Sequence, residues 1–395
     1  MLNQYYWPGV EATANLLTEL CEALADDYEV TVVTGTVPGS RPEQTTRNGV
    51  DVVRVPSTAY DRSRLSRRTS NYLTYVFWAV RVAVRMERPS VVVCMTDPPF
   101  LGTAAELVAR RFGVPLLLIS QDVFPEIAVK LGRLQNRVVV GLLRVLVARA
   151  LRRADRVVVI GETMQKRVEA KGVEPRRMRV IPNWGDAGRI EPQPRDNEWA
   201  RAQGLLGSFV VMHSGNVGHA QDLDTLIRAT TLLRDLDDLV AMIIGGGARY
   251  DELAELARRL DADAVRFLPY QPRDVLPQSL ASADVHVVGL ARGLAGYVVP
   301  SRLYGILAAG RPVIAAAEAE SETAQLVLRS GCGVVVPPGD PLGLAEAIRA
   351  CHDGELDLAE MARRAREYAE TVTDRRIAVD RYRSVIEEVR LGDRR

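Results

Sequence analysis

Short apolar runs of the kind found in buried strands alternate with helix-like stretches along almost the whole chain. This alternation favours parallel sheets covered by helices on both faces, because parallel strands need a crossover connection. In the first half the runs are Val30–Thr34, Val50–Val55, Ser90–Met95, Pro115–Ser120, Arg156–Ile160 and Arg179–Pro182. In the second half they are Phe209–His213, Val240–Ile244, Val265–Leu268, Val285–Val288, Val313–Ala316 and Gly333–Val336. We predict an α/β fold of two doubly wound, Rossmann-like domains that face each other across a cleft.

The chain has 395 residues, which is too long for one hydrophobic core. The best domain boundary is a connector bearing Pro and Asp that begins at Asn183-Trp184-Gly185 and runs through Asn197. We predict an N-terminal domain over 1–183 and a C-terminal domain over 184–372. An amphipathic helix in 373–395, near Arg375–Val389, is expected to pack back on the N-terminal domain.

The start of the chain departs from the doubly wound pattern. Such a domain normally opens with a central buried strand, yet only Met1-Leu2 precedes the turn at Asn3–Pro8. We therefore predict that the first strand is truncated. One interpretation is that Met1 is an internal methionine of a longer reading frame.

Composition narrows the class of protein. A hydrophobic content of 47% with 26% charged residues is typical of a soluble globular chain. No basic and apolar leader follows Met1, and no apolar run reaches the roughly eighteen residues of a membrane span. The four cysteines and four histidines are scattered, with no CxxC pair. We therefore expect a cytoplasmic protein without a metal site and without a nucleic-acid partner.

The stretch Gly293–Ala316 predicts a loop, a helix and a strand in quick succession. Pro300 is expected in the first helical turn, and Gly310 ends the helix. Ser301 and Arg302 then lie at a helix N-terminus, where free N–H groups and a cation suit a phosphate. The alternative is an ordinary helix–strand unit with a solvated arginine.

Three further stretches follow strands of the second half, at the sheet edge where doubly wound folds bind ligands. Gly215 and Asn216, within Ser214–Gly218, would let the backbone approach a phosphate, although the loop is equally consistent with a plain glycine turn. Gly245-Gly246-Gly247 lacks the spacing of a dinucleotide fingerprint. Tyr270 either faces a base or closes a turn.

In the first half, Asp122 and Glu126 follow the predicted strand Pro115–Ser120. The alternative reading is that Asp122 caps a turn and Glu126 is solvated. No Ser-His-Asp or Cys-His grouping is visible. Asp122, Glu126 and Arg302 are the candidate catalytic residues, and Gly215, Asn216, Tyr270, Ser301 and Arg302 are the candidate donor-binding residues.

Taken in order, these stretches resemble the retaining nucleotide-sugar glycosyltransferases of the GT-B fold. The closer likeness is to the WbuB-like branch from bacterial O-antigen, colanic-acid and capsule assembly. In the first half the resemblance lies in Tyr5–Thr13, Gln121–Glu126 and Ile181–Trp184. In the second half it lies in Ser214–Gly218, Val299–Gly305, Ala309–Val313 and Cys332–Asp340.

The resemblance implies a nucleotide diphosphate sugar, with a UDP-sugar favoured, on the second domain. It also implies a polyprenyl-linked or saccharide acceptor on the first domain, and no catalytic metal. Gly215 and Asn216 would lie by the pyrophosphate, and Arg302 would neutralise the leaving diphosphate. Asp122 falls where relatives have a polar residue near the transferred sugar.

One departure from the family concerns a pair of glutamates separated by seven residues, the second of which grips the ribose in many relatives. Here those positions are Tyr297 and Gly305. A catalytically silent GT-B domain that binds a sugar nucleotide or a partner is therefore an alternative to an active transferase. A third hypothesis, an NAD-dependent enzyme, rests on the glycines alone.

Charge is distributed unevenly between the two halves. Residues 1–180 hold 26 Lys and Arg against 18 Asp and Glu, whereas the remainder is acidic. The excess is concentrated in Arg62–Arg88, with Tyr72, Tyr75, Phe77 and Trp78, and in the apolar and basic segment Arg137–Arg156. We predict docking on the anionic inner face of the plasma membrane. The alternative is that the second segment is a core helix with a solvated basic edge.

Overall fold

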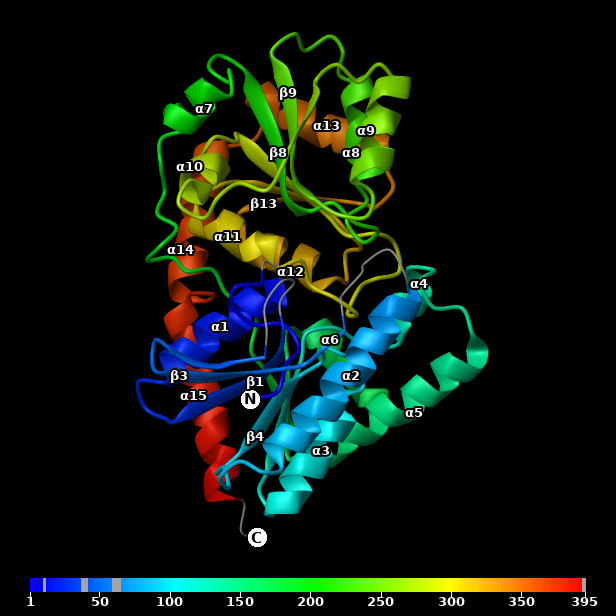
Figure 1. Ribbon diagram of the computed structural model, residues 1–395. Helices are drawn as coiled ribbons and strands as arrows, with labels where there is room; N and C mark the ends of the chain where they lie inside the picture. Colours follow the sequence, from blue (N-terminus) through cyan, green and yellow to red (C-terminus); the bar gives the residue numbers. More distant parts are fainter. Residues whose placement is uncertain (10–11, 37–41, 59–64, 393–395) are drawn as a thin grey trace. The chain divides into compact units, whose positions relative to one another are not determined.

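The computed structural model describes residues 1–9, 12–36, 42–58 and 65–392, with the backbone alone for 12 and 65–68. The chain divides into two compact units (Figure 1). Unit 1 comprises Met1–Pro182, Gly296–Val298 and Ala378–Arg395, and unit 2 comprises Asn183–Ala295 and Val299–Ile377. The chain therefore leaves unit 2 for three residues in its second half and returns to unit 1 at its C-terminal helix.

Unit 1 is built on strands that the apolar runs predicted, with one polar exception. Its strands are β1 (Val30–Gly35), β2 (Gln44–Arg47), β3 (Val50–Val55), β4 (Val92–Met95), β5 (Leu116–Ser120), β6 (Arg156–Val159) and β7 (Met178–Val180). They pair in the orders β1-β3-β2 and β4-β5-β6-β7, and only β2 is antiparallel to its neighbour. The fully buried β5 is typical of a parallel strand covered on both faces.

A short segment at the start of the chain joins the two groups of strands in unit 1. Leu2 forms parallel bridges to Val33 of β1 and to Cys94 of β4. The Leu2 N–H donates to the Val93 carbonyl at 2.8 Å, and the Val33 N–H donates to the Met1 carbonyl at 2.9 Å. The central position, where the sequence suggested a truncated strand, is thus occupied by the first few residues.

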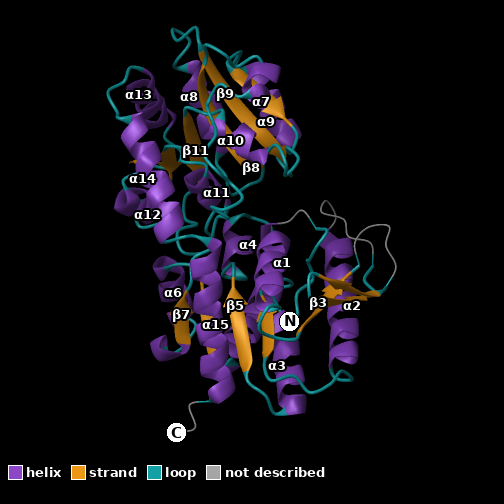
Figure 2. Ribbon diagram, turned by 90° about the vertical axis from the view of Figure 1, so that its left-hand side faces the viewer, coloured by secondary structure: helices purple, strands orange, loops and turns teal. Residues whose placement is uncertain are grey.

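Helices cover both faces of the unit 1 strands (Figure 2). They are α1 (Ala12–Leu24), α2 (Leu65–Ala83), α3 (Leu101–Phe112), α4 (Glu126–Lys130), α5 (Arg137–Arg153), α6 (Glu162–Glu169) and a 3-10 turn (Pro175–Arg177). The Asn136 side chain caps α5 by accepting from the N–H groups of Val138 and Val139. The cap explains why this helix starts where it does.

The last helix, α15 (Arg375–Leu391), joins unit 1 from Ala378 onward. Glu388 accepts from Arg156 at 2.7 Å and also pairs with Arg179. The Tyr28 hydroxyl donates to Glu387 at 2.7 Å. These polar contacts surround a buried apolar side that includes Tyr382 and Val385.

Unit 2 contains one parallel sheet in the order β10-β9-β8-β11-β12-β13. Its strands are β8 (Phe209–Asn216), β9 (Leu239–Gly246), β10 (Val265–Leu268), β11 (Val285–Gly289), β12 (Val313–Ala316) and β13 (Gly333–Val336). The chain builds outward from β8 in one direction and from β11 in the other. The β8/β11 junction is therefore the switch point, where a doubly wound sheet opens a crevice.

Successive β8 residues belong to cores on opposite faces of the unit 2 sheet. Val211 lies in one buried apolar cluster, whereas Val210 and Met212 lie in the other. The covering helices are α7 (Glu198–Ala202), α8 (Leu223–Thr231), α9 (Tyr250–Arg259), α10 (Leu276–Ala281), α11 (Arg302–Ala308), α12 (Glu322–Ser330), α13 (Pro341–His352) and α14 (Leu358–Thr371). The predicted doubly wound α/β class is confirmed.

Neither a membrane-spanning helix nor a metal-ligand cluster is present in the described ranges. Within 1–9, 12–36, 42–58 and 65–392, no helix combines the length and apolar character needed to cross a bilayer. Over those same ranges, no three His, Cys, Asp or Glu side chains gather as they would around a metal ion.

Candidate active site

The switch point of unit 2 is lined by backbone packed too closely for side chains. Gly215 is the second-last residue of β8, with φ of +146°, and Gly245 is the second-last residue of β9, with φ of +141°. A Cβ atom on Gly245 would lie 1.8 Å from the Gly215 carbonyl oxygen. Only glycine allows this approach and this backbone conformation. The two predicted glycine loops therefore form one surface of bare backbone.

Arg302 lies against this surface. A Cβ atom on Gly215 would meet the Arg302 Cδ at 3.3 Å, and the Arg302 Nη2 donates to the Gly289 carbonyl at 2.9 Å. The Arg302 Nε is buried and has no hydrogen-bond partner in the described part of the chain. Burial lowers the pKa of Arg302 to about 10, so the guanidinium stays charged near neutral pH. Arg302 is therefore not a solvated surface arginine.

The helix that carries Arg302 is shorter than the sequence suggested. The seven-residue α11 begins at Arg302, and Pro300 precedes it. Expecting Pro300 in the first helical turn was therefore wrong. Ser301 has helical backbone angles and makes no side-chain cap. Arg302 is therefore the first residue of this short helix, and its guanidinium is held by the Gly289 carbonyl.

Asn216 and Tyr270 extend the same edge of the sheet. The exposed Asn216 donates to Gln221 at 3.3 Å, and Gln221 also accepts the Gly218 N–H at 3.0 Å. The Tyr270 hydroxyl donates to the Gly246 carbonyl at 3.1 Å, and its ring is 55% exposed. Arg302 thus lies against Gly215, Asn216 follows Gly215 as the last residue of β8, and Tyr270 lies just past the end of β10.

Two unit 2 residues that the sequence did not single out support this edge. The buried His213 ring contacts the Asn216 carbonyl through Nε2 at 3.3 Å. Burial, and then the charge of Arg302, hold the pKa of His213 well below its ordinary value, so the ring is neutral. The Glu318 carboxylate accepts the N–H of Gly293 at 3.0 Å and so fixes the loop that leads toward Arg302. The position of His213 directly before the glycine loop was the available signal.

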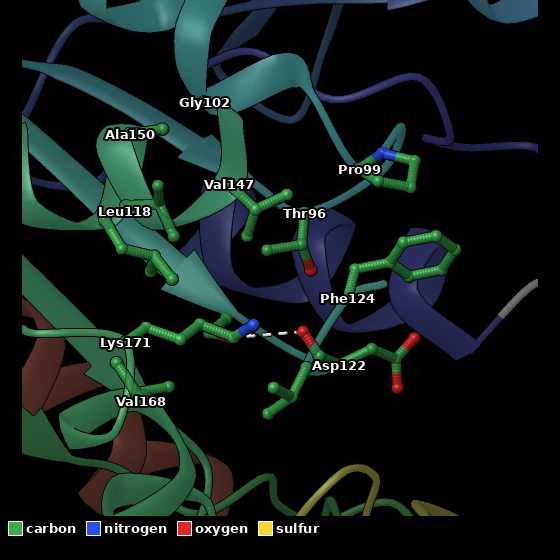
Figure 3. A pocket seen from close by; sticks show the side chains of 13 residues that line it. Thr96, Pro99, Gly102, Leu118, Asp122, Phe124, Val147, Ala150, Val168 and Lys171 are labelled. Atoms are coloured by element: carbon green, nitrogen blue, oxygen red, sulfur yellow. Dashed lines mark hydrogen bonds between the residues drawn. The ribbon is translucent and has the colours of Figure 1, made fainter. Parts of the chain in front are cut away.

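In unit 1, Asp122 lies at the carboxyl end of β5 and lines a mainly apolar pocket (Figure 3). The pocket is also lined by Thr96, Pro99, Gly102, Leu118, Ser120, Val123, Phe124, Val147, Ala150, Leu151, Val168 and Lys171. Burial, and then the nearby Asp97 carboxylate, raise the pKa of Asp122 to about 7. This carboxyl therefore changes its charge near neutral pH.

Glu126 does not line the pocket with Asp122. Its carboxylate pairs with Lys171 at 2.6 Å and with Arg144 at 3.4 Å. The expectation that Glu126 is simply solvated is wrong, because its side chain is only 20% exposed and doubly paired. In Figure 3 the Asp122 carboxylate points away from Lys171. The two predicted carboxylates thus have different surroundings.

Unit 2 thus has a glycine-lined switch point beside Arg302, and unit 1 is a second α/β unit with Asp122 at a strand end. Residues 12–184 match the Glycosyl transferase 4-like domain, and residues 196–372 match Glycosyl transferases group 1. The chain belongs to this glycosyltransferase family, which has the GT-B fold.

Relatives in sequence and structure agree with this assignment. The chain is 31% identical over 309 residues to the probable glycosyltransferase WbjE of Pseudomonas aeruginosa, covering 76% of each chain. It is 30% identical over 301 residues to WcaI of Escherichia coli strain K12, named as a colanic acid biosynthesis glycosyl transferase, covering 74% of this chain and 73% of WcaI. Anabaena HepE, solved with UDP, has a TM-score of 0.74 at 17% identity over 98% of both chains.

Proposed function

We propose that this glycosyltransferase moves a sugar from a UDP-sugar to a lipid-linked or growing saccharide acceptor in cell-surface polysaccharide synthesis, with retention of anomeric configuration and without a metal. The observation that carries the donor half is the half-buried, positively charged Arg302, whose buried Nε has no partner among the described residues and which lies beside the bare backbone at Gly215. The polysaccharide context is supported by the name of WcaI. UDP is favoured because HepE has been solved with UDP and with UDP-glucose.

In this proposal the diphosphate lies at the switch point of unit 2. Gly215 and Asn216 let the backbone approach the phosphates, and Arg302 donates its free Nε–H to them. Negative charge grows on the diphosphate as its bond to the sugar breaks, so a fixed cation there stabilises the transition state more than the ground state. Ser301 adds a neighbouring hydroxyl, and Tyr270 offers an exposed ring for the base.

Asp122 acts at the sugar or the acceptor. With a pKa of about 7 it is roughly half ionised at neutral pH, so it is able to accept a proton from an acceptor hydroxyl or to donate a hydrogen bond to the sugar. Glu126, although first considered catalytic, is assigned to support this strand end through its pairs with Lys171 and Arg144. The proposed catalytic residue Asp122 and the supporting residue Glu126 thus lie in the same short stretch from the end of β5 to the first residue of α4.

The acceptor proposal includes docking of unit 1 on the anionic cytoplasmic face of the plasma membrane. Helix α5 turns an apolar row outward: Val138 is 81% exposed and Val145 is 63% exposed, with Leu142 between them. Only Val140, Val147, Ala150 and Leu151 of α5 are buried. A core helix with a basic edge would have buried this row, so the exposed row supports docking over that alternative.

Helix α2 extends the proposed docking surface, but only two of its four predicted aromatic residues, Phe77 and Trp78, are exposed. Phe77 is 61% exposed and packs edge-to-face on Trp78, and the Arg81 guanidinium lies 5.9 Å from the Trp78 ring centroid. Tyr72 and Tyr75 were expected at the headgroups but are buried. Arg62 and Arg64 lie outside the described residues. Because α3 packs against both α2 and α5, the three helices form one layer.

A catalytically silent sugar-nucleotide-binding domain is the second candidate. The observation in its favour is that Tyr297 and Gly305 occupy the positions where the resembled family carries its two glutamates. Incubation with a set of UDP-sugars and membrane lipid extract separates the two. The proposed enzyme releases UDP, transfers sugar in the presence of EDTA, and gives a product with the donor's anomeric configuration by NMR. Binding of UDP without any transfer would support the silent domain instead.

A further inference from the structure

Tyr297 belongs to unit 1, although the chain before Gly296 and after Val298 belongs to unit 2. Its carbonyl accepts the N–H of Val123 at 2.9 Å. Val123 directly follows Asp122, so this hydrogen bond holds the turn that carries the proposed catalytic carboxyl.

Two cations lie against the Tyr297 ring. The Lys130 Nζ lies 5.1 Å from the ring centroid, and the Arg167 Cζ lies 4.6 Å from it. Lys130 is the last residue of α4 and Arg167 lies on α6. Both distances are within the range of attractive cation–π contacts. The ring therefore ties together the two helices that flank the Asp122 turn.

Gly296, the residue before Tyr297, also helps to hold the segment Gly296–Val298 in place. Gly296 has φ of +78°, and a Cβ atom there would lie 2.7 Å from the Thr163 carbonyl oxygen. The backbone thus comes against the start of α6 more closely than any other residue type allows. Gly296 holds the three-residue segment through its close backbone approach to Thr163, and Tyr297 holds it through the contacts of its ring with Lys130 and Arg167.

The opposite end of α4 is fixed independently. Glu126, its first residue, pairs with Lys171 at 2.6 Å. The short helix is thus held at its start by an ion pair and at its end by Lys130 on the Tyr297 ring.

We propose that Tyr297 is a positioning residue that holds the Asp122 turn in place, through the hydrogen bond from Val123 to its carbonyl and through the contacts of its ring with Lys130 and Arg167. This inference rests on the proposed function, because the turn matters for catalysis only if Asp122 takes part. It assigns a task to a position where the resembled family carries glutamate. The tyrosine acts through the turn, and is not itself a reacting group.

Hydrogen exchange of the full chain tests the seating without any need for activity. Tyr297→Leu removes the ring, and Gly296→Ala displaces the segment although the tyrosine side chain is retained. We expect both variants to speed exchange of peptides covering 121–130 by about tenfold or more, because local opening becomes easier. Tyr297→Phe is the matched control and should exchange like the wild type, since it keeps the ring. Unchanged exchange in Tyr297→Leu would overturn the proposal.

Kinetics then separate positioning from general damage. In Tyr297→Leu we expect kcat to fall by about ten- to a hundredfold, the size expected for a misplaced catalytic group, with the donor KM within about twofold of wild type. Tyr297→Phe should restore kcat. Equal losses in the Leu and Phe variants would contradict the role of the ring. If no variant and no wild-type protein transfers sugar, the proposed function fails, whereas the exchange result still decides whether Tyr297 seats the turn.

Discussion

Two ionisable side chains, Arg302 and Asp122, are central to the proposed chemistry, and burial shifts the pKa of both. Arg302 has a lowered pKa of about 10 and still keeps its charge, whereas Asp122 has a raised pKa of about 7 and loses its charge near neutrality. The order of motifs in the sequence was enough to single out both residues. It was not enough to predict that Glu126 is paired, because Lys171 and Arg144 come from distant parts of the chain.

Asp122 should make stability depend on pH. Its folded-state pKa lies above the ordinary value of about 3.9, so the native chain binds more protons than the unfolded chain between about pH 4 and 7. The free energy of unfolding therefore falls as pH rises through that window. Asp122→Asn removes this penalty and should stabilise the protein by about 1–2 kcal/mol at pH 8, a value reduced for the partial exposure of the side chain.

Urea unfolding of the wild type and Asp122→Asn at pH 4 and pH 8 measures this effect. The difference between the two proteins should be small at pH 4 and should grow toward pH 8. A difference that is the same at both pH values would mean that the Asp122 carboxyl titrates normally.

At the scale of elements, apolar runs predicted the buried strands well. The strands β10, β12 and β13 have the predicted bounds, because each is a compact run between turn residues. The polar edge strand β2 was missed, since its exposed Gln-Thr-Thr-Arg sequence lacks any apolar alternation. The helix α14 was missed for a similar reason: its buried residues are only Ala365 and Ala369. Elements that bury few apolar side chains lack the apolar periodicity from which strands and helices are predicted.

The glycine loops at the ends of β8 and β9 should be the least tolerant elements of unit 2. Gly245→Ala would place a Cβ atom 1.8 Å from the Gly215 carbonyl oxygen and would strain a backbone at φ of +141°. We expect a loss of about 3 kcal/mol or more in the free energy of unfolding, together with loss of UDP binding.

Gly207→Ala is the matched control for this prediction. Gly207 also has a positive φ, of +77°, but a Cβ atom there would meet nothing within 4 Å. Its cost should therefore be only about 1 kcal/mol, from backbone strain alone, with UDP binding retained. Urea unfolding and calorimetric titration with UDP compare the two. Equal costs for the two variants would rule out the close contact between the β8 and β9 loops.

In the whole molecule, basic residues are concentrated in the first half of the sequence, and the structure shows which apolar side chains are exposed on the same helices. The excess of basic residues in 1–180 includes the arginines of α5, a helix that exposes Val138, Leu142 and Val145. The burial of Tyr72 and Tyr75 was not predictable from composition, because an aromatic residue on an amphipathic helix suits either the core or the surface.

Liposome flotation tests the membrane proposal. Each basic residue near an anionic leaflet contributes about 1 kcal/mol, so anionic vesicles should carry the protein at low salt and release it near about 0.5 M salt. The triple change of Val138, Leu142 and Val145 to Ser should weaken binding by removing the inserting row. As a control, Ser at the exposed Leu206, Leu232 and Leu328 of unit 2 should leave binding unchanged. Equal binding to neutral and anionic vesicles at low salt would contradict docking.

Arg302 is proposed to stabilise the diphosphate that leaves the sugar. The most direct measurement is the turnover number of Arg302→Ala relative to wild type, at saturating concentration of the UDP-sugar from which the wild type releases UDP. We expect a fall of about a hundredfold or more, as when one preorganised donor is lost, and a smaller fall for Arg302→Lys. Arg292→Ala, which removes an exposed arginine bonded to the Pro338 carbonyl, is the control and should stay near wild type. Turnover of Arg302→Ala within about threefold of the wild type would contradict the account.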